Sequence, residues 1–319
     1  MDIIFYDFEF NKIFILPPSS KNIGYTSMNA TKEFNGDGKF ELVFFDMDLV
    51  KTIKEHPEGI FIVWDDFYGF VTDWQFGKEY RIFGISLNGI LHKTVIPPTP
   101  LITENCAKLA QSTRKKYFSD ILGWSNISSS KHNTVTFETT EYKYGNEYIQ
   151  SILELDSSGY EVVIDFENKY LVLNIYPSKE NPIMLSLGNL NIYDLQEDFN
   201  NKTVAYGGYY QKESEESEEE GQWLYITIDD TKTGFYKQDI ILKAKTEDEA
   251  RNELKEYAIE HKLTGKTKNI KYGIDYKLGD KVRVMQDDYA VWKKVTAISK
   301  WYEGSTINEE PTLSEIKEG

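Results

Sequence analysis

Two adjacent aspartate pairs, Asp65-Asp66 and Asp287-Asp288, are the side chains of this chain best suited by type to acid–base chemistry. A glycoside hydrolase needs two carboxylates that face each other across a cleft. Neighbouring residues on a strand point to opposite faces, so neither pair meets that geometry by itself. Aspartate is also a preferred turn residue. We interpret both pairs as turns and keep, as the alternative, a cell-wall or glycan hydrolase whose acids converge only in the folded chain.

The other reactive side chains show no spacing typical of a catalytic or metal site. The segment TGKT at residues 264–267 follows a predicted helix instead of preceding one and lacks the first glycine of a phosphate-binding loop. The single cysteine, Cys106, excludes an internal disulfide and a thiolate zinc cluster. The four histidines form no paired ligand spacing: His56, His92, His132 and His261. We therefore predict no catalytic residue, no cofactor, no metal and no enzymatic activity.

Composition and charge describe a globular, β-rich and acidic chain. Its 319 residues are 40% hydrophobic and 14% aromatic, and 52 acidic against 36 basic side chains give a net charge of −16. Such a surface repels nucleic acid and anionic lipid, which disfavours specific binding of either and suits a passage through which DNA moves. Without a basic leader or a long apolar run, we expect synthesis in a cytoplasm and no membrane insertion.

Residues 213–220, with the sequence ESEESEEE, form a low-complexity acidic run between two predicted strands. Self-repulsion keeps such a segment extended and solvated, so we predict a surface loop. The alternative is that the run lines a channel or contacts a basic partner.

The elements around these residues predict an α+β fold, mainly β, with three parts. Residues 1–98 alternate apolar and polar positions, and Asp46 is a good N-cap for one short helix, so they predict a first β-barrel domain. Residues 99–182 combine two helical patterns with a hairpin and predict an inserted small α+β domain. Residues 183–319 return to strands and predict a second β-barrel domain, with a helix at 247–262 and the acidic loop at 213–220.

The stretch at residues 271–302 anchors the second barrel, because Val282 and Val284 alternate with polar residues before Asp287-Asp288 and the alternation resumes at Val295. The same order occurs around Asp65-Asp66: an apolar strand, two aspartates, an aromatic residue, then a Val-Thr return strand. Chance similarity is one explanation. The other is an internal repeat that gives one related barrel at each end of the chain.

Three segments resemble the tail hub proteins of siphophages and prophages, the family that forms the N-terminal hub region of tail-associated lysins and baseplates. The motif DYKLGDKVRV at residues 275–284 matches the family hallmark DYxLGDxVxV. The strand GKFEL at 38–42 and the hairpin at 69–74 resemble the family's opening. The segment at 201–243, through Gly207-Gly208 and Gly234, resembles its middle. Residues 101–182 match only as a helix followed by a hairpin.

The resemblance implies a homotrimeric ring at the tip of the tail tube, in which each chain gives two barrels and three chains present six to a hexameric tube. It also implies contacts with distal tail and tail tube proteins, with tape measure or tip, spike or fibre proteins, and passage of phage DNA without specific binding. The expected location is the virion tail. Hydrolases carried by larger members are then absent here or reside on a separate polypeptide. A carbohydrate-binding module, motivated by the aromatic content, is a further alternative.

Overall fold

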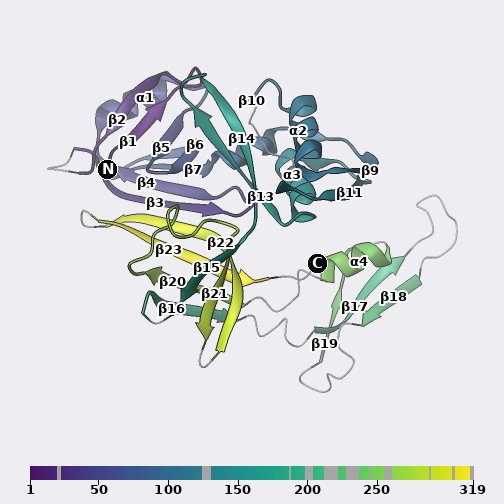
Figure 1. The fold of residues 1–319 in the computed structure, drawn as a ribbon. Helices are drawn as coiled ribbons and strands as arrows, with labels where there is room; N and C mark the ends of the chain where they lie inside the picture. The colour runs from purple at the N-terminus through teal and green to yellow at the C-terminus, as the bar shows by residue number, and fades with distance from the viewer. Residues whose placement is uncertain are drawn as a thin grey trace. The chain divides into compact units, whose positions relative to one another are not determined.

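The structure is a computed structural model that describes residues 1–19, 23–123, 131–186, 188–197, 204–211, 222–227, 237–244, 246–254, 261–286, 289–303 and 306–316. The chain divides into two compact units (Figure 1). Unit 1 comprises Met1–Tyr193 and Thr264–Gly319, and unit 2 comprises Asp194–Leu263. Strands dominate both units and helices are few, so the predicted α+β, mainly β class is confirmed.

Seven antiparallel strands build the first β region, in the order β3-β4-β7-β6-β5-β1-β2. They are β1 (Ile3–Tyr6), β2 (Lys12–Leu16), β3 (Tyr25–Glu33), β4 (Lys39–Phe44), β5 (Phe61–Trp64), β6 (Phe67–Phe76) and β7 (Tyr80–Ser86). The Tyr25 N–H donates to the Pro17 carbonyl at 3.0 Å, so the path returns from the end of β2 to the start of β3. This barrel-like arrangement encloses an apolar core that includes Phe5, Leu42 and Trp64.

One helix of the first region begins where the sequence predicts. Helix α1 (Met47–Glu55) has Asp46 as its N-cap, and the Asp46 carboxylate accepts a hydrogen bond from the Asp48 backbone N–H at 2.9 Å. Its buried residues, Leu49, Val50 and Ile53, lie on one face and pack into the core of the first region.

The middle segment contains the predicted helices and hairpin. Its helices are α2 (Cys106–Tyr117) and α3 (Gly145–Glu154), with the 3-10 helix η1 (Leu87–Lys93) before them. Its strands are β8 (Val95–Ile96), β9 (Thr99–Asn105), β10 (Leu122–Gly123), β11 (Thr134–Thr139), β12 (Lys143–Tyr144), β13 (Ser158–Asp165) and β14 (Tyr170–Pro177). Phe61 on β5 and Leu91 on η1 share one core with Ile149 on α3. Because this core crosses residue 98, the middle segment and the first β region belong to one compact unit.

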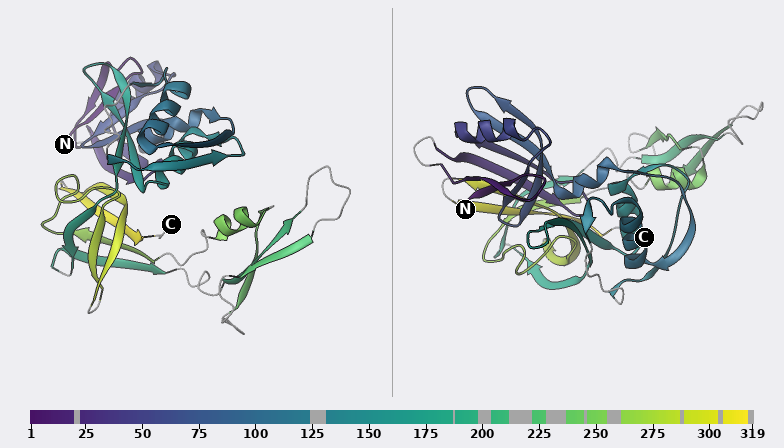
Figure 2. Two further views of the ribbon diagram at one scale, coloured as in Figure 1. Left: turned by 45° about the vertical axis from the view of Figure 1, so that its right-hand side comes forward. Right: turned by 90° about the horizontal axis from the view of Figure 1, so that it is seen from above.

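Six strands form the second β region, in the order β15-β21-β22-β23-β20-β16. They are β15 (Glu180–Leu185), β16 (Leu190–Glu197), β20 (His261–Thr267), β21 (Lys281–Gln286), β22 (Tyr289–Glu303) and β23 (Thr306–Glu315). The predicted hairpin of residues 271–302 is present as β21 and β22. Strand β22 also pairs with β3 (Figure 2). Both β regions therefore belong to one continuous 13-stranded sheet, whose strands β16 and β20 extend past the sequence boundaries of unit 1.

Unit 2 contains the segment that the sequence placed inside the second barrel. Strands β18 (Gln222–Thr227), β17 (Val204–Gln211) and β19 (Gln238–Ile241) form a separate three-stranded sheet, and helix α4 (Glu247–Leu254) packs on it. The expectation that residues 183–319 make one barrel is therefore corrected, because this sheet has its own core and pairs with no strand of the 13-stranded sheet among the described residues.

The predicted helix at 247–262 is also corrected at its end. Helix α4 covers Glu247–Leu254, and residues 261 and 262 belong to strand β20, which pairs within the second β region. Local helical periodicity did not reveal this strand, because its partners come from distant parts of the chain. The acidic loop at 213–220 lies outside the described residues.

The two hairpins with the aspartate pairs close in the same register. Trp64 pairs with Phe67 across Asp65-Asp66, and Gln286 pairs with Tyr289 across residues 287 and 288. Both pairings are antiparallel and enclose two residues. Residues 287 and 288 themselves lie outside the described part of the chain, and the register of their flanking strands is what the two hairpins share.

Candidate functional site

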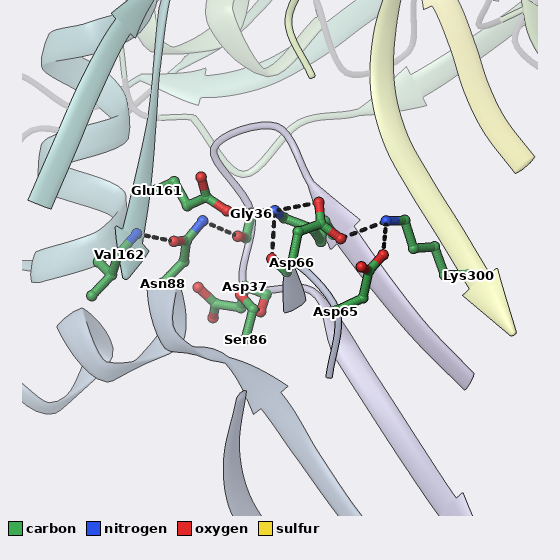
Figure 3. A network of polar contacts seen from close by, with 10 residues as sticks. Gly36, Asp37, Asp65, Asp66, Ser86, Asn88, Glu161, Val162 and Lys300 are labelled. Carbon is green, nitrogen blue, oxygen red and sulfur yellow. Dashed lines mark hydrogen bonds and ion pairs between the residues drawn. The ribbon is translucent and has the colours of Figure 1, made fainter. Parts of the chain in front are cut away.

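Two lysines and an aspartate pair form a charge network where the two β regions join. The Lys300 ammonium on β22 lies 2.8 Å from Asp65 Oδ2 and 2.5 Å from Asp66 Oδ1 (Figure 3). The Lys32 ammonium on β3 lies 3.5 Å from Asp66 Oδ2 and donates to the Asp66 carbonyl at 3.1 Å. Both lysine side chains are nearly buried, with 11% of Lys32 and 7% of Lys300 exposed.

Strand register places the two lysines on one face of the sheet. Ile298 pairs with Lys32 and Lys300 pairs with Ala30, so the lysines stand two positions apart on adjacent strands. Asp65 has a φ of 57°, a left-handed conformation that aspartate tolerates better than most residues. This tight turn between β5 and β6 presents both carboxylates to the lysines.

The middle segment adds a third partner to the network. Glu161 on β13 forms an ion pair with Lys32. The ring of Tyr272 lies beneath both ammonium groups, with its centroid 5.5 Å from Lys32 Nζ and 5.3 Å from Lys300 Nζ. The network thus connects the first β region, the middle segment and the second β region, all within unit 1.

The electrostatics favour ion pairs over proton transfer. Burial alone would raise the pKa of Asp66, but the positive charges of Lys32 and Lys300 outweigh it and hold that pKa below its usual value. Burial alone would lower the pKa of Lys32, but Glu161, Tyr272 and Asp66 raise it. Burial raises the pKa of Tyr272 to about 12. Asp66 is therefore a carboxylate and both lysines are cations at neutral pH.

A hydrogen-bonded asparagine holds the neighbouring turn to the middle segment. Asn88 donates through Nδ2 to the Gly36 carbonyl at 3.1 Å and accepts from the Val162 N–H at 2.8 Å (Figure 3). Asn35 likewise donates to the Ser158 carbonyl at 3.0 Å and accepts from the Tyr160 N–H at 3.1 Å. The Asn35-Gly36 turn between β3 and β4 therefore also connects parts of unit 1.

A cavity of about 470 Å³ lies beside the network. Its walls come from all three parts of unit 1 and include Lys32, Tyr68, Tyr160, Glu161, Tyr176 and Tyr272. Asp65 and Asp66 do not face each other across it, because their carboxylates contact Lys300. The turn interpretation of Asp65-Asp66 is confirmed, and these two carboxylates are not the opposed acids that glycoside hydrolysis requires.

A buried Ser–His–Asp cluster was missed by the sequence analysis. His132 Nδ1 lies 2.7 Å from Asp156 Oδ2 and 3.1 Å from Ser158 Oγ, and Ser158 Oγ also donates to Asp156 at 2.8 Å. In a catalytic triad the serine and the acid contact opposite nitrogens of the ring. Here both contact Nδ1, so the cluster does not match a triad. Its hydrogen bonds connect the segment before β11 with the turn and first residue of β13.

The remaining sequence candidates lie apart from one another. His56 contacts Glu58, and His92 stacks on Tyr144 with ring centroids 3.9 Å apart. Cys106 is buried, and burial raises the pKa of its thiol to about 12, so it is not a reactive thiolate. Within the described ranges, no group of three or more His, Cys, Asp or Glu side chains is arranged to hold a metal ion.

The helices of the described segments include none that is long and apolar enough to cross a membrane. No protein-family model and no curated protein matches the sequence. Solved structures do match, over nearly the whole chain.

The tail protein from Neisseria meningitidis MC58 is 12% identical, with a TM-score of 0.57 over 98% of this chain and 96% of that one. Prophage tail protein gp18 from Listeria monocytogenes EGD-e is 15% identical, with a TM-score of 0.53 over 100% and 96%. The 43 kDa tail protein of prophage MuSo2 from Shewanella oneidensis is 12% identical, with a TM-score of 0.52 over 99% and 98%. The chain therefore has the fold of phage and prophage tail proteins, in agreement with its sequence resemblance to tail hubs.

Proposed function

We propose that this chain is a structural tail hub protein of a phage, a prophage or a phage-tail-like particle. Three copies would form a ring at the tip of the tail tube and connect the tube with the distal tail and tip proteins. The observation that carries the proposal is the likeness to tail proteins across essentially the whole chain.

The architecture of unit 1 supports a ring-forming role. Its two β regions are joined through the β3–β22 pair, and their aspartate hairpins close in the same register. We propose that these hairpins mark an internal repeat, through which three chains would present six similar surfaces to a six-fold tube. The buried ion pairs of Lys32 and Lys300 connect the two β regions and the middle segment. Such connections suit a structural component that keeps one shape in an assembly.

A passive role toward DNA fits the net charge of −16, because an acidic ring repels the phosphate backbone. We further propose that the chain has no catalytic role. Asp65 and Asp66, the strongest acid candidates, are both engaged by Lys300. The partners expected of a hub are a second and third copy, tube and distal tail proteins, and tape measure, tip, spike or fibre proteins.

The test combines mass and imaging. Light scattering of the purified chain should show a concentration-dependent trimer, and electron microscopy of that species should show a three-fold ring with a central opening. A chain that is absent from purified tail particles would contradict the proposal. Degradation of purified cell wall that is lost on Asp66→Asn, but retained in the exposed control Asp48→Asn, would favour the hydrolase alternative instead.

A further inference from the structure

The small sheet of unit 2 has one covered and one uncovered face. Helix α4 packs on the covered face, where Tyr209, Ile226 and Leu242 form a core with Ala250 of the helix. Alternation along the strands sends their neighbours to the other side. The register places Tyr210 opposite Trp223, and Gly208 opposite Tyr225 and beside Ile241.

These large side chains are exposed together. The exposed fractions are 42% for Tyr210, 54% for Trp223, 67% for Tyr225 and 76% for Ile241. We call these four residues the aromatic face. Tyr210 and Trp223 meet edge to face, with ring centroids 5.5 Å apart. Adjacent exposed aromatic residues on a rigid sheet are typical of protein interaction sites, in which Trp and Tyr contribute most of the binding energy.

Gly208 shows that the ring of Tyr225 is positioned across the neighbouring strand. A Cβ atom built on Gly208 would lie 3.1 Å from the Tyr225 ring, so the ring covers the backbone of β17 at this point. Gly208 thus makes room for an aromatic side chain that still keeps two thirds of its surface exposed. A ring held in this way loses little conformational entropy on binding.

Charge indicates the chemistry of the occupant. The aromatic face itself is uncharged, but residues 194–263 contain 18 Asp and Glu against 9 Lys and Arg, a net charge of −9 in unit 2. A second copy of this acidic unit would be repelled. A partner with basic residues around an apolar centre would be attracted and would cover the aromatic rings.

We propose that the aromatic face of unit 2 is a docking surface for a different protein, one that presents an apolar patch surrounded by Lys and Arg. The inference rests on the proposed function only in that the partner is sought in tail particles. Its location on unit 2 is independent of the network in unit 1.

The experiment places a photo-crosslinking amino acid at Tyr225 in the full chain and uses tail particles assembled from it. Mass spectrometry identifies the linked chain and peptide. The matched control carries the crosslinker at Arg251, which is exposed on α4 and lies on the covered side of the same sheet. We expect a crosslink from position 225, and none from 251, to a lysine- or arginine-rich peptide of another tail protein.

A second measurement quantifies the interaction with that identified protein. The double variant Trp223→Ser, Tyr225→Ser should weaken its binding at least about tenfold, as expected for interface aromatic residues, while Arg251→Ser should leave it unchanged. A crosslink from position 225 to a second copy of this chain, to an acidic peptide or to no protein would overturn the inference. Absence of the chain from the particles would instead contradict the proposed function.

Discussion

Units 1 and 2 use the same residue types in opposite ways. Unit 1 buries large aromatic residues such as Trp64 and Tyr160. It also contains nearly buried ion pairs, in which Lys32 and Lys300 contact three carboxylates. Unit 2 leaves Trp223 and Tyr225 exposed on a sheet covered on one side only. Rings such as Trp64 therefore stabilise the core of unit 1, whereas Trp223 and Tyr225 of unit 2 present their rings to solvent.

The difference follows from size as well as from sequence. Unit 2 spans 70 residues, and a domain of that size builds only a small core. Among its described residues, helix α4 covers one face of the sheet, and the other face presents exposed side chains. Unit 1 is longer, and residues from all three of its parts contact the buried lysines Lys32 and Lys300.

The largest effect is expected from two matched tryptophan substitutions. Trp64→Ala should lower the free energy of unfolding by about 3–5 kcal/mol, because its ring is fully buried in the first core. Trp223→Ala should change it by no more than about 0.5 kcal/mol, because that ring is exposed. Urea denaturation followed by circular dichroism measures both. Similar losses for the two variants would show that the aromatic face is covered in the isolated chain.

The second prediction compares a buried lysine with an exposed one. Lys32→Ala leaves Glu161 without its ion pair and removes one of the two cations beside Asp66, so we expect a loss of about 2–4 kcal/mol. Lys51→Ala removes a solvent-exposed pair with Asp48 and should leave the free energy of unfolding almost unchanged. The same denaturation measurement applies. Equal, small effects would mean that the network contributes little to the cohesion of unit 1.

The third prediction concerns Lys294 on β22, whose ammonium lies 3.7 Å from the centroid of the Phe34 ring. Burial and the nearby charge of Lys281 lower its pKa from 10.5 to about 8. Between these values the unfolded chain binds more protons than the folded one, so this lysine makes stability rise with pH. Lys294→Met removes that rise.

We expect Lys294→Met to stabilise the chain at pH 7 by about 1 kcal/mol, less than the full pKa shift implies, because the side chain is only partly buried and the Phe34 ring attracts the cation. The advantage should shrink by pH 10. Denaturation at both pH values checks this, with Lys39→Met, at an exposed position at the start of β4, as the control. A pH-independent difference would exclude Lys294 as the titrating group.

The smallest effect is expected from deleting residues 213–220. Gln211 pairs with Gln222, so the deletion leaves Lys212 and Gly221 as a two-residue connection of the length that favours tight hairpins. The unfolding free energy should change by no more than about 0.5 kcal/mol, and the chain should still assemble. Insoluble protein would show that this acidic segment packs against the fold, contrary to the predicted solvated loop.

Local patterns were sufficient to predict many elements. Alternation around Val282 and Val284 predicts the β21–β22 hairpin, and Asp46 predicts the start of α1, because these features depend on contacts between near neighbours in sequence. The same reasoning correctly interpreted Asp65-Asp66 as a turn, since turn chemistry is also local.

The lysine network required the tertiary structure. Lys300 and Asp65 are separated by 235 positions, and only the β3–β22 register brings Lys300 and Lys32 to one face. Neither lysine stands out in the sequence, since a lysine on an alternating strand normally faces solvent. The His132–Asp156 pair was also missed, because its residues are 24 positions apart and meet only in the folded chain.

The sequence by itself determined the class of fold, the acidic balance and the resemblance to tail hubs, since composition, alternation and short motifs are properties of neighbouring residues. Only the tertiary structure decided that residues 194–263 form their own unit, that residues 261 and 262 are strand, and that Trp223 and Tyr225 are exposed while Trp64 is buried. These outcomes depend on which distant strands pair and on how many elements are available to cover each face, and a linear pattern specifies neither.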